Sequence, residues 1–429
     1  MPHHSIEAPP VMGGMERSGR PPIPPRPATS PDRGGITVVV PLPPSYRGGT
    51  EEYAYHLAKG FSRLQETRVV TTTVRWNPST ISLDTGAASV ERLPARELFE
   101  RPVMLSPIAR ARLRRAVGVS SIVNLHMPFP SVEAAATAEA NRAHVPIVLT
   151  YHMDADLRAA MPGPGSSLVT SLYRRLSAHP ALENCDAVVA NSRGYAQAST
   201  VLSSHLSKVT VIPKGVDPER LGIGGPGQRD PPACVSGIVR SNATFRLLFV
   251  GRLVPYKGVG ILLRAVEQLF RQGQKVTLMI AGNGPLRPEL ERQAATLDIK
   301  SRVIFVGFVP DEQMGDLYRF ADLTVIPSVG VLESSATALE EAAACGCPVV
   351  GSDLPGASES IPNDGIRGRL VTPGDPSAIA DAIARMMAGP RAPPPVNVRT
   401  WDDVKRDYLA LFQTLGVSIQ ERETPKAAV

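Results

Sequence analysis

Two pairs of charged residues in the C-terminal half have the chemistry expected of a site for a phosphorylated ligand. Arg252 and Lys257 stand five residues apart in GRLVPYKG, directly after a strand-like run. A bidentate guanidinium and a compact ammonium together suit a diphosphate, although two such cations can also be solvated loop charges. Glu333 and Glu341 follow in ESSATALEEAAACGCPVV. Their eight-residue spacing is about 80° more than two helical turns, which does not favour an acid–base pair.

The spacing of the two glutamates has a different use if a helix begins near Ser334 or Ser335. Glu333 then lies at the mouth of the helix, and Glu341 lies two turns along its side. Because the two carboxylates are separated along one helix, both can accept hydrogen bonds from one extended ligand.

The N-terminal half has glycines and histidines at the ends of strand-like runs. Gly48 and Gly49, in PPSYRGGTEEY, precede a helical pattern. Glycines allow positive φ and let backbone N–H groups approach phosphate, but a plain tight turn also explains the pair. His126 and His152 end the runs SIVNLHM and VPIVLTYH. His126 is either a buried, internally satisfied histidine or a group at the ligand-binding edge, and His152 extends that edge.

Metal and disulfide chemistry are not expected. Asp154 and Asp156 form a D-x-D that can hold a divalent cation through ligand phosphates, but acids at a helix start explain the pair without a metal. The four cysteines, Cys185, Cys234, Cys345 and Cys347, lack C-x-x-C spacing and a small secreted domain, which does not favour a disulfide framework or zinc site and fits a reducing cytoplasm.

The order of elements explains how these residues come together. Short β-branched runs alternate with helical patterns such as TEEYAYHLAKGFSRL, which predicts βαβ units and two Rossmann-like halves with parallel sheets. Ligands of such sheets bind beyond the carboxyl ends of the strands, so we expect the site in the cleft between the halves. The predicted strands are 36–43, 67–74, 121–127, 145–152, 186–192 and 208–215, then 245–252, 275–284, 302–309, 322–328, 347–353 and 368–373.

The length of 429 residues predicts two domains, and no apolar run approaches the length of about 20 residues that a membrane span needs. Residues 1–35 hold nine prolines and no apolar signal-peptide core, which predicts a disordered tail and a cytoplasmic protein. The predicted organisation is a tail at 1–35, a first domain at 36–215, a linker at 216–242, a second domain at 243–395, a last helix at 396–415 and a tail at 416–429.

The first domain is the basic one, with 19 Lys/Arg against 13 Asp/Glu in residues 36–215. Its densest cluster is Arg110, Arg112, Arg114 and Arg115, on a predicted helix. The cluster is either a solvated helix face or a surface for anionic membrane headgroups, and nucleic acid is not an expected partner.

In combination, these motifs resemble glycosyltransferase family four, the retaining, metal-independent GT-B enzymes. The match is collinear over nearly all of residues 36–415, and its specificity lies in the ordered set. The set is GG at 48–49, H at 126, YH at 151–152, IPKGVD at 212–217, GRLVPYKG at 251–258, AGNGP at 281–285, VGFVPDEQMGDLY at 306–318, Glu333 to Glu341, ACGCPVVGSD and GRLVTPGDP. The resemblance implies an α/β GT-B fold, in which two Rossmann-like domains face each other across a cleft.

The resemblance also implies roles for individual residues. The second domain would hold a nucleotide-sugar donor, the first an acceptor, and the last helix would cross back to the first domain; no cofactor is implied. Arg252 and Lys257 would contact the donor diphosphate, and Glu341 the ribose. Glu333 would contact the sugar hydroxyls beside Ser334, Ser335 and Ala336, and His126 the reacting sugar. Gly307 and Val309 would face the base, and Gly48 and Gly49 the phosphate. Tyr151 and His152 would lie in the acceptor region, and His126, Arg252, Lys257 and Glu333 would be catalytic.

Several positions depart from the family pattern. Ser335 and Ala336 stand where the family commonly has Phe-Gly after the first glutamate. Lys214 replaces a frequent asparagine, and Glu340 replaces an apolar residue beside Glu341. These departures concern the fit of the sugar and the phosphate.

The sequence therefore predicts a cytoplasmic enzyme that transfers a hexose from a GDP- or UDP-sugar, with retention and without a metal, to a glycan, lipid or small-molecule acceptor. Two alternatives stay open: a GT-B sugar-nucleotide epimerase, and a non-catalytic nucleotide-sugar-binding protein.

Overall fold

The computed structural model describes residues 34–45, 48–73, 84–98, 101–103, 106–155, 166–223, 231–236, 244–330, 336–389 and 395–419. Glu333, Ser334, Ser335, Asp156 and most of both predicted tails lie outside these residues.

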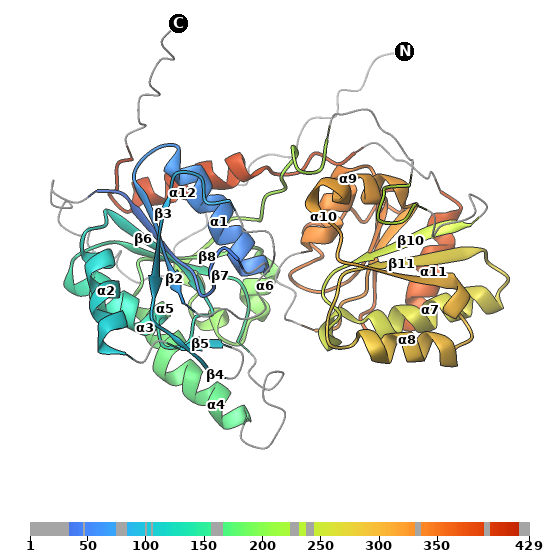
Figure 1. Ribbon diagram of the computed structural model, residues 1–429, viewed down its shortest axis with the longest axis horizontal. Coiled ribbons are helices and arrows are strands. Elements are labelled where there is room, and N and C mark those ends of the chain that lie inside the picture. The colour runs from blue at the N-terminus through green and yellow to red at the C-terminus, as the bar shows by residue number, and fades with distance from the viewer. Residues whose placement is uncertain are drawn as a thin grey trace, which may run out of the picture.

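The first domain is built on a seven-stranded parallel sheet with the strand order β3-β2-β1-β6-β7-β8-β9 (Figure 1). The chain moves outward from β1 to β3 and then returns to the other side of β1, so the switch point lies between β1 and β6. Its strands are β1 (Ile36–Val39), β2 (Thr67–Thr72), β3 (Ser89–Leu93), β6 (Ile122–Met127), β7 (Ile147–Tyr151), β8 (Ala187–Ala190) and β9 (Val209–Val211).

Helices cover both faces of this sheet, since successive side chains of a strand point to opposite sides. Val39 packs into a core with α2, α3 and α5, whereas Val38 packs into a core with α1 and α12. The helices are α1 (Gly49–Ser62), α2 (Pro107–Gly118), α3 (Glu133–Arg142), α4 (Ser166–Tyr173), a π-helical turn (Arg174–Ala178), α5 (His179–Asn184) and α6 (Arg193–Ala198). A small antiparallel hairpin, β4 (Arg96–Leu98) and β5 (Arg101–Val103), stands apart from the sheet.

The second domain has a six-stranded parallel sheet with the order β12-β11-β10-β13-β14-β15 and its switch point between β10 and β13. Its strands are β10 (Phe245–Val250), β11 (Val276–Ala281), β12 (Val303–Gly307), β13 (Leu323–Ile326), β14 (Val349–Ser352) and β15 (Gly368–Val371). Its helices are α7 (Val259–Arg271), α8 (Arg287–Thr296), α9 (Asp311–Phe320), α10 (Thr337–Ala344) and α11 (Pro376–Met387).

The chain passes between the domains twice, and the two crossing segments pair with each other. Val216 donates its N–H to the Arg399 carbonyl over 2.8 Å and forms a parallel bridge with Thr400. Beyond this bridge, α12 (Trp401–Thr414) packs on α1 of the first domain, as Figure 1 shows. Tyr408 of α12 is wholly buried, and its hydroxyl lies 2.7 Å from Thr150 Oγ1.

The predicted fold class is confirmed, and each of the twelve predicted strands is present, most of them shorter at one or both ends than predicted. Strands β3, β4 and β5 were not predicted. The sequence of β3, SVERL, has polar residues at alternate positions. The strand lies at the edge of the sheet, where little of it is buried, so its sequence has no continuous apolar run. In the parts of the chain that the structure describes, no helix combines the length and hydropathy needed to cross a membrane.

Candidate active site

The loops after β10 and β13 meet at the switch point of the second sheet. The N–H of Val329 donates to the Tyr256 carbonyl over 2.7 Å. Gly258 has a φ of +68°, and a Cβ there would stand 2.0 Å from the Pro327 carbonyl oxygen, so the position requires glycine. These contacts place the loop with Arg252 and Lys257 beside the loop that leads to α10.

Arg252 and Lys257 lie on this edge, as the sequence predicts for residues that follow a strand. Arg252 is exposed and Lys257 is half-buried, with its Nζ 5.5 Å from the centre of the Tyr256 ring. Helix α7 begins two residues later and has no side-chain N-cap. Its first N–H groups therefore add to the positive field at the edge, which suits an anionic ligand.

Glu341 is a buried carboxylate with two strong partners. The Arg220 guanidinium forms an ion pair with one of its oxygens, and the Tyr318 hydroxyl donates to the other over 2.9 Å. Burial raises the pKa of Glu341, and the charge of Arg220 works against that rise. Arg220 also lies 3.6 Å from Asp311. A depression of about 510 Å³ adjoins this cluster and is lined by Glu219, Arg220, Leu221, Gly222, Asp311, Glu312, Asp316 and Arg319.

The start of α10 differs from the prediction. The helix begins at Thr337, not at Ser334 or Ser335, because Ala336 has a non-helical backbone with φ −99° and ψ 49°. Ala336 is buried and has no side chain that can cap the helix. The two serines therefore precede the helix, and their predicted contact with the sugar, like that of Glu333, stays a prediction.

The segment after β12 places one aromatic side chain outward. Gly307 has a φ of +81°, and Val309 is buried. Between them Phe308 is 56% exposed. Sequence reasoning assigned the base to Gly307 and Val309 and missed Phe308, whose exposed ring lies next to both.

Gly48 and Gly49 stand at the start of α1, which follows the switch-point strand β1 of the first sheet. Gly48 is extended, with φ −134° and ψ 161°, and a Cβ on Gly49 would meet nothing within 4 Å. The positive φ that glycine allows is not used by this pair, because the chain enters the helix from an ordinary extended conformation. What the glycines leave is open space beside a helix N-terminus without a side-chain cap.

His126 and His152 form one buried chain of hydrogen bonds. His126 Nδ1 lies 2.9 Å from His152 Nε2, and His126 Nε2 lies 2.9 Å from Asn124 Oδ1. Asn124 in turn donates from Nδ2 to Thr150 Oγ1 and to the Val148 carbonyl. The Val148 carbonyl can only accept, so the Asn124 amide nitrogen faces it and the Asn124 Oδ1 faces His126. His126 must therefore donate from Nε2 to Asn124 Oδ1 and accept at Nδ1 from His152.

Both histidines are neutral at neutral pH. Burial lowers the pKa of His126 well below its ordinary value, and burial together with the charge of Lys214 lowers the pKa of His152 to about 3. His126 is 0% exposed and both of its nitrogens are bonded, so in this arrangement it orients His152. Within the described residues, the remaining nitrogen of His152, Nδ1, has no hydrogen bond and is left as an acceptor.

Lys214 lies between the two domains and is buried. Its charge acts on His56 and His152 of the first domain and on Glu340 and Glu341 of the second. Glu340 has its Oε2 buried without a hydrogen-bond partner in the described residues, and burial raises its pKa. The two departures from the family pattern, Lys214 and Glu340, therefore share one electrostatic environment.

Tyr151 and Asp154 belong to a different, structural cluster. The Asp154 carboxylate accepts from the Tyr151 hydroxyl over 3.0 Å, from the Thr200 N–H over 3.0 Å and from the Ser199 hydroxyl. These bonds tie β7 to the segment after α6. They account for the buried carboxylate of Asp154 without a ligand. Among the described residues, no group of three or more His, Cys, Asp or Glu side chains is placed to hold a metal ion.

The two domains also touch at the N-terminus of α6. The Glu359 carboxylate of the second domain accepts from the backbone N–H groups of Arg193 and Gly194. A Cβ on Gly194 would stand 2.5 Å from the Pro355 carbonyl oxygen, so the close approach depends on glycine.

Two parallel Rossmann-like sheets, the second with a basic edge at its switch point, define the GT-B class of fold. Family profiles agree: "Glycosyltransferase Family 4" matches residues 47–220, and "Glycosyl transferases group 1" matches residues 244–389. The chain belongs to glycosyltransferase family four.

Relatives support this placement, and a solved structure shares the fold. The O-antigen chain mannosyltransferase C of Escherichia coli is 27% identical over 79% of this chain and 85% of its own length. The D-rhamnosyltransferase WbpZ of Pseudomonas aeruginosa is 30% identical over 65% of this chain and 68% of its own. The crystal structure of Anabaena HepE in complex with UDP and glucose has a TM-score of 0.65 and 19% identity, covering 89% of this chain and all of that one.

Proposed function

We propose that the protein is a retaining hexosyltransferase that takes its sugar from a GDP- or UDP-linked donor without a metal ion. The observation that carries the proposal is the basic edge formed by Arg252 and Lys257, held by backbone contacts beside the loop leading to α10 and Glu341. The mannosyltransferase relative and the UDP and glucose bound to HepE are consistent with a hexose and a nucleoside diphosphate.

On the donor side, Arg252 and Lys257 would bind the diphosphate, and Glu341 the ribose hydroxyls. Glu333, with Ser334, Ser335 and Ala336, would contact the sugar. Gly307 and Val309 would face the base, with Phe308 offering a ring for stacking, and the open α1 N-terminus at Gly48 and Gly49 would approach phosphate.

On the acceptor side, His152 and Tyr151 mark the edge of the first sheet. His152 Nδ1 is the histidine nitrogen available to a ligand, and His126 holds its tautomer. A direct bond between His126 and the sugar, which the family resemblance implies, requires this buried network to open.

The reaction would form a bond between an acceptor oxygen and the sugar C1 on the face from which the diphosphate departs. The bond from C1 to the phosphate oxygen breaks, and the acceptor proton passes to that oxygen. Arg252, Lys257 and the α7 N-terminus stabilise the negative charge that develops on the leaving group, so neither a protein nucleophile nor a metal is needed.

The acceptor would be a glycan, a lipid or a small molecule, in the cytoplasm.

Arg110, Arg112 and Arg115 are exposed on α2, whereas Arg114 pairs with Glu139 over 3.1 Å. The exposed arginines are free to contact anionic headgroups, and replacing all three with glutamine should weaken salt-sensitive binding to anionic vesicles.

The test of the donor site uses Arg252→Ala and Lys257→Ala with isothermal titration of UDP and GDP. Loss of a charged hydrogen bond should weaken nucleotide binding by about tenfold or more in each variant. Arg292→Ala, on α8, is the matched control and should bind normally. Unchanged nucleotide affinity in both variants would falsify the assignment.

Two alternatives are separated by product analysis. Donor incubated without acceptor should stay unchanged or hydrolyse slowly; an epimerised sugar nucleotide as sole product would identify an epimerase. A protein that binds donor but transfers nothing to any acceptor pool would be a non-catalytic binding protein. Anomeric NMR of the product tests retention, and activity in excess chelator tests metal independence.

A further inference from the structure

The helix that runs from α4 through Arg174–Ala178 into α5 carries three highly exposed leucines. Leu168, Leu172 and Leu176 expose 71%, 52% and 63% of their surface. Four residues advance about 400° in an α-helix, so Leu168 and Leu172 lie about 40° apart, and Leu176 follows four residues later in the wider π-helical turn, on the same side. They form one apolar strip, here named the leucine ridge, of a kind that water-facing helices seldom display.

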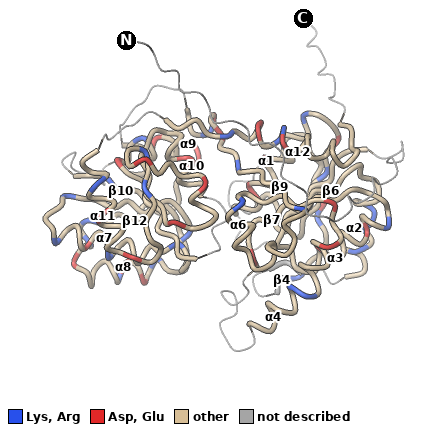
Figure 2. The backbone as a smooth tube through the Cα atoms, turned by 180° about the vertical axis from the view of Figure 1, so that it is seen from behind, with Lys and Arg blue, Asp and Glu red and all other residues tan. Residues whose placement is uncertain are grey.

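The ridge points away from the rest of the first domain. The opposite side of the same helix is anchored, since Thr170, Ser177, Ala181 and Leu182 are buried. Figures 1 and 2, from opposite directions, both show α4 projecting at the lower edge of the first domain near β4. The ridge therefore lies at the outer edge of the first domain and faces solvent.

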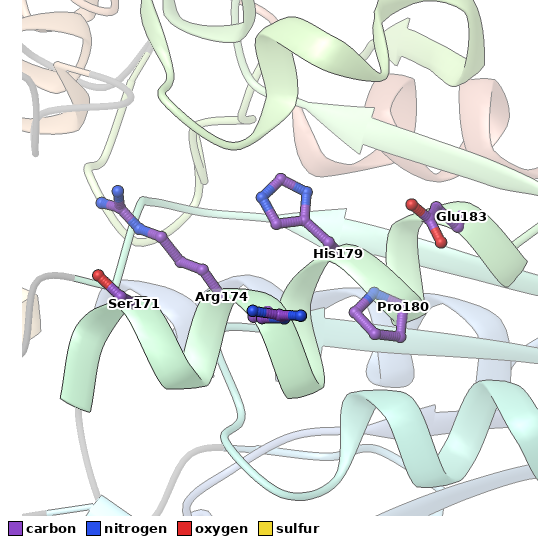
Figure 3. A pocket seen from close by; sticks show the side chains of 6 residues that line it. Ser171, Arg174, His179, Pro180 and Glu183 are labelled. Atoms are coloured by element: carbon purple, nitrogen blue, oxygen red, sulfur yellow. The ribbon is translucent and has the colours of Figure 1, made fainter. Parts of the chain in front are cut away.

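Basic groups flank the ridge. Arg175 is exposed. It follows Leu168 by seven residues, which is close to two full helical turns, so it lies along the same strip. A depression of about 390 Å³ beside it is lined by Ser171, Arg174, Arg175, His179, Pro180 and Glu183. In Figure 3, Arg174 and His179 point to the same side of the helix. Arg174 Nε is buried without a hydrogen-bond partner in the described residues, so this N–H is available to an anion only after local rearrangement.

The arginines of α2 belong to the same layer of the domain. Helix α2 packs on α3, partly through the Arg114–Glu139 pair, and α3 packs on α5 and the π-helical turn. All of these helices cover one face of the first sheet. The leucine ridge and most of the exposed basic side chains on the helices of this domain therefore lie on the same face of the first sheet.

We propose that the leucine ridge, with Arg174 and Arg175, binds the surface of an anionic lipid bilayer. The helix would lie in the plane of the interface, with the leucines between the headgroups and the guanidinium groups on lipid phosphates. A symmetric contact between two copies of the chain is disfavoured, because it would bring like-charged arginines together. The inference adds an apolar contact on a second helix to the anionic-headgroup contact proposed for α2, and it does not depend on the proposed enzymatic reaction.

The test is sedimentation of the full chain with phosphatidylcholine vesicles and with vesicles that also contain phosphatidylglycerol. We expect binding to the anionic vesicles only, weakening as salt is added. Leu168→Ser/Leu172→Ser/Leu176→Ser should lower the affinity at least about tenfold. Arg174→Gln/Arg175→Gln should lower it by about fivefold per arginine. Ile366→Ser, an exposed apolar residue of the second domain, should bind as the unchanged chain does.

Four outcomes would overturn the proposal. These are no vesicle binding by the unchanged chain, full binding by the leucine variant, binding equally strong without anionic lipid, and a dimer in light scattering that the leucine substitutions dissociate. The melting temperature of the leucine variant guards against a folding artefact: a large decrease would show that the ridge is covered inside the folded chain, which also contradicts the proposal.

Discussion

At the scale of residues, the charge of Glu341 depends on a contact that spans the linker. Arg220 reaches it from the segment that leaves the first domain, and Tyr318 holds its other oxygen. If Glu341 binds ribose hydroxyls, Arg220 is its positioning residue, because its charge opposes the rise in the Glu341 pKa that burial causes and its ion pair holds the carboxylate in place. The Arg220–Glu341 pair therefore links the linker to the donor site.

Arg220→Gln should leave a buried carboxylate without its cation and lower the free energy of unfolding by about 2 kcal/mol. The KM for the donor should rise more than kcat falls. Urea unfolding and donor-dependent kinetics measure both. Arg220→Lys, which keeps the charge, should recover part of each; full donor affinity in Arg220→Gln would show that Arg220 has no positioning role.

The neutral histidines predict how stability depends on acid. The pKa of His152 is about 3 in the folded chain and near 6.5 when unfolded, so below pH 6.5 the unfolded state binds more protons. Stability is therefore present above pH 6.5 and is lost as pH falls, by up to about 1.4 kcal/mol per pH unit for this group.

His152→Gln should reduce this slope by about half a proton on average between pH 7.5 and 5.5, and by nearly one proton at the acidic end, in urea unfolding. Glu340 and Glu341, whose pKa values are raised, act in the opposite direction in both proteins and cancel in the comparison. Parallel curves for the two proteins would exclude a neutral, buried His152.

At the scale of elements, glycines have different roles at the two switch points. Gly258 adopts a left-handed conformation and touches the Pro327 carbonyl, whereas Gly49 is a helical residue with open space around it. The first is required by the fold. The second is not required by packing, so a role of Gly49 in ligand approach can be tested without disturbing the fold.

Two substitutions test this difference. Gly258→Ala should lower the free energy of unfolding by about 2 kcal/mol or more, through strain and a clash. Gly49→Ala should keep or raise the melting temperature, because alanine favours the helix. If phosphate approaches the backbone there, Gly49→Ala should still raise the donor KM by about tenfold. A normal KM would show that the glycine pair forms only a turn.

The elements themselves were largely predictable. Buried parallel strands such as β6 and β7 appear as continuous apolar runs, and α12 has a helical period with a capping box at Thr400. The helix α10 was placed two to three residues too early because the serines that suggested a start precede a non-helical Ala336.

At the scale of the whole molecule, the domains are joined by the paired crossing segments and by Glu359 at the N-terminus of α6. Glu359→Ala should release the α6 contact and increase the radius of gyration in small-angle scattering without donor. Glu289→Ala, an exposed acid on α8, is the matched control. The same radius in both variants would show that Glu359 does not hold the domains together.

The sequence by itself determined the family, the order of strands and helices, and the strand ends that carry Arg252, Lys257 and His126. It could do so because apolar periodicity and motif spacing are local properties of the chain. Only the tertiary structure decided that Arg220 meets Glu341 across 121 positions, that His126 is buried behind His152, and that the leucine ridge is uncovered. These outcomes depend on how distant elements pack, and no local pattern records which side chains that packing brings together or leaves in water.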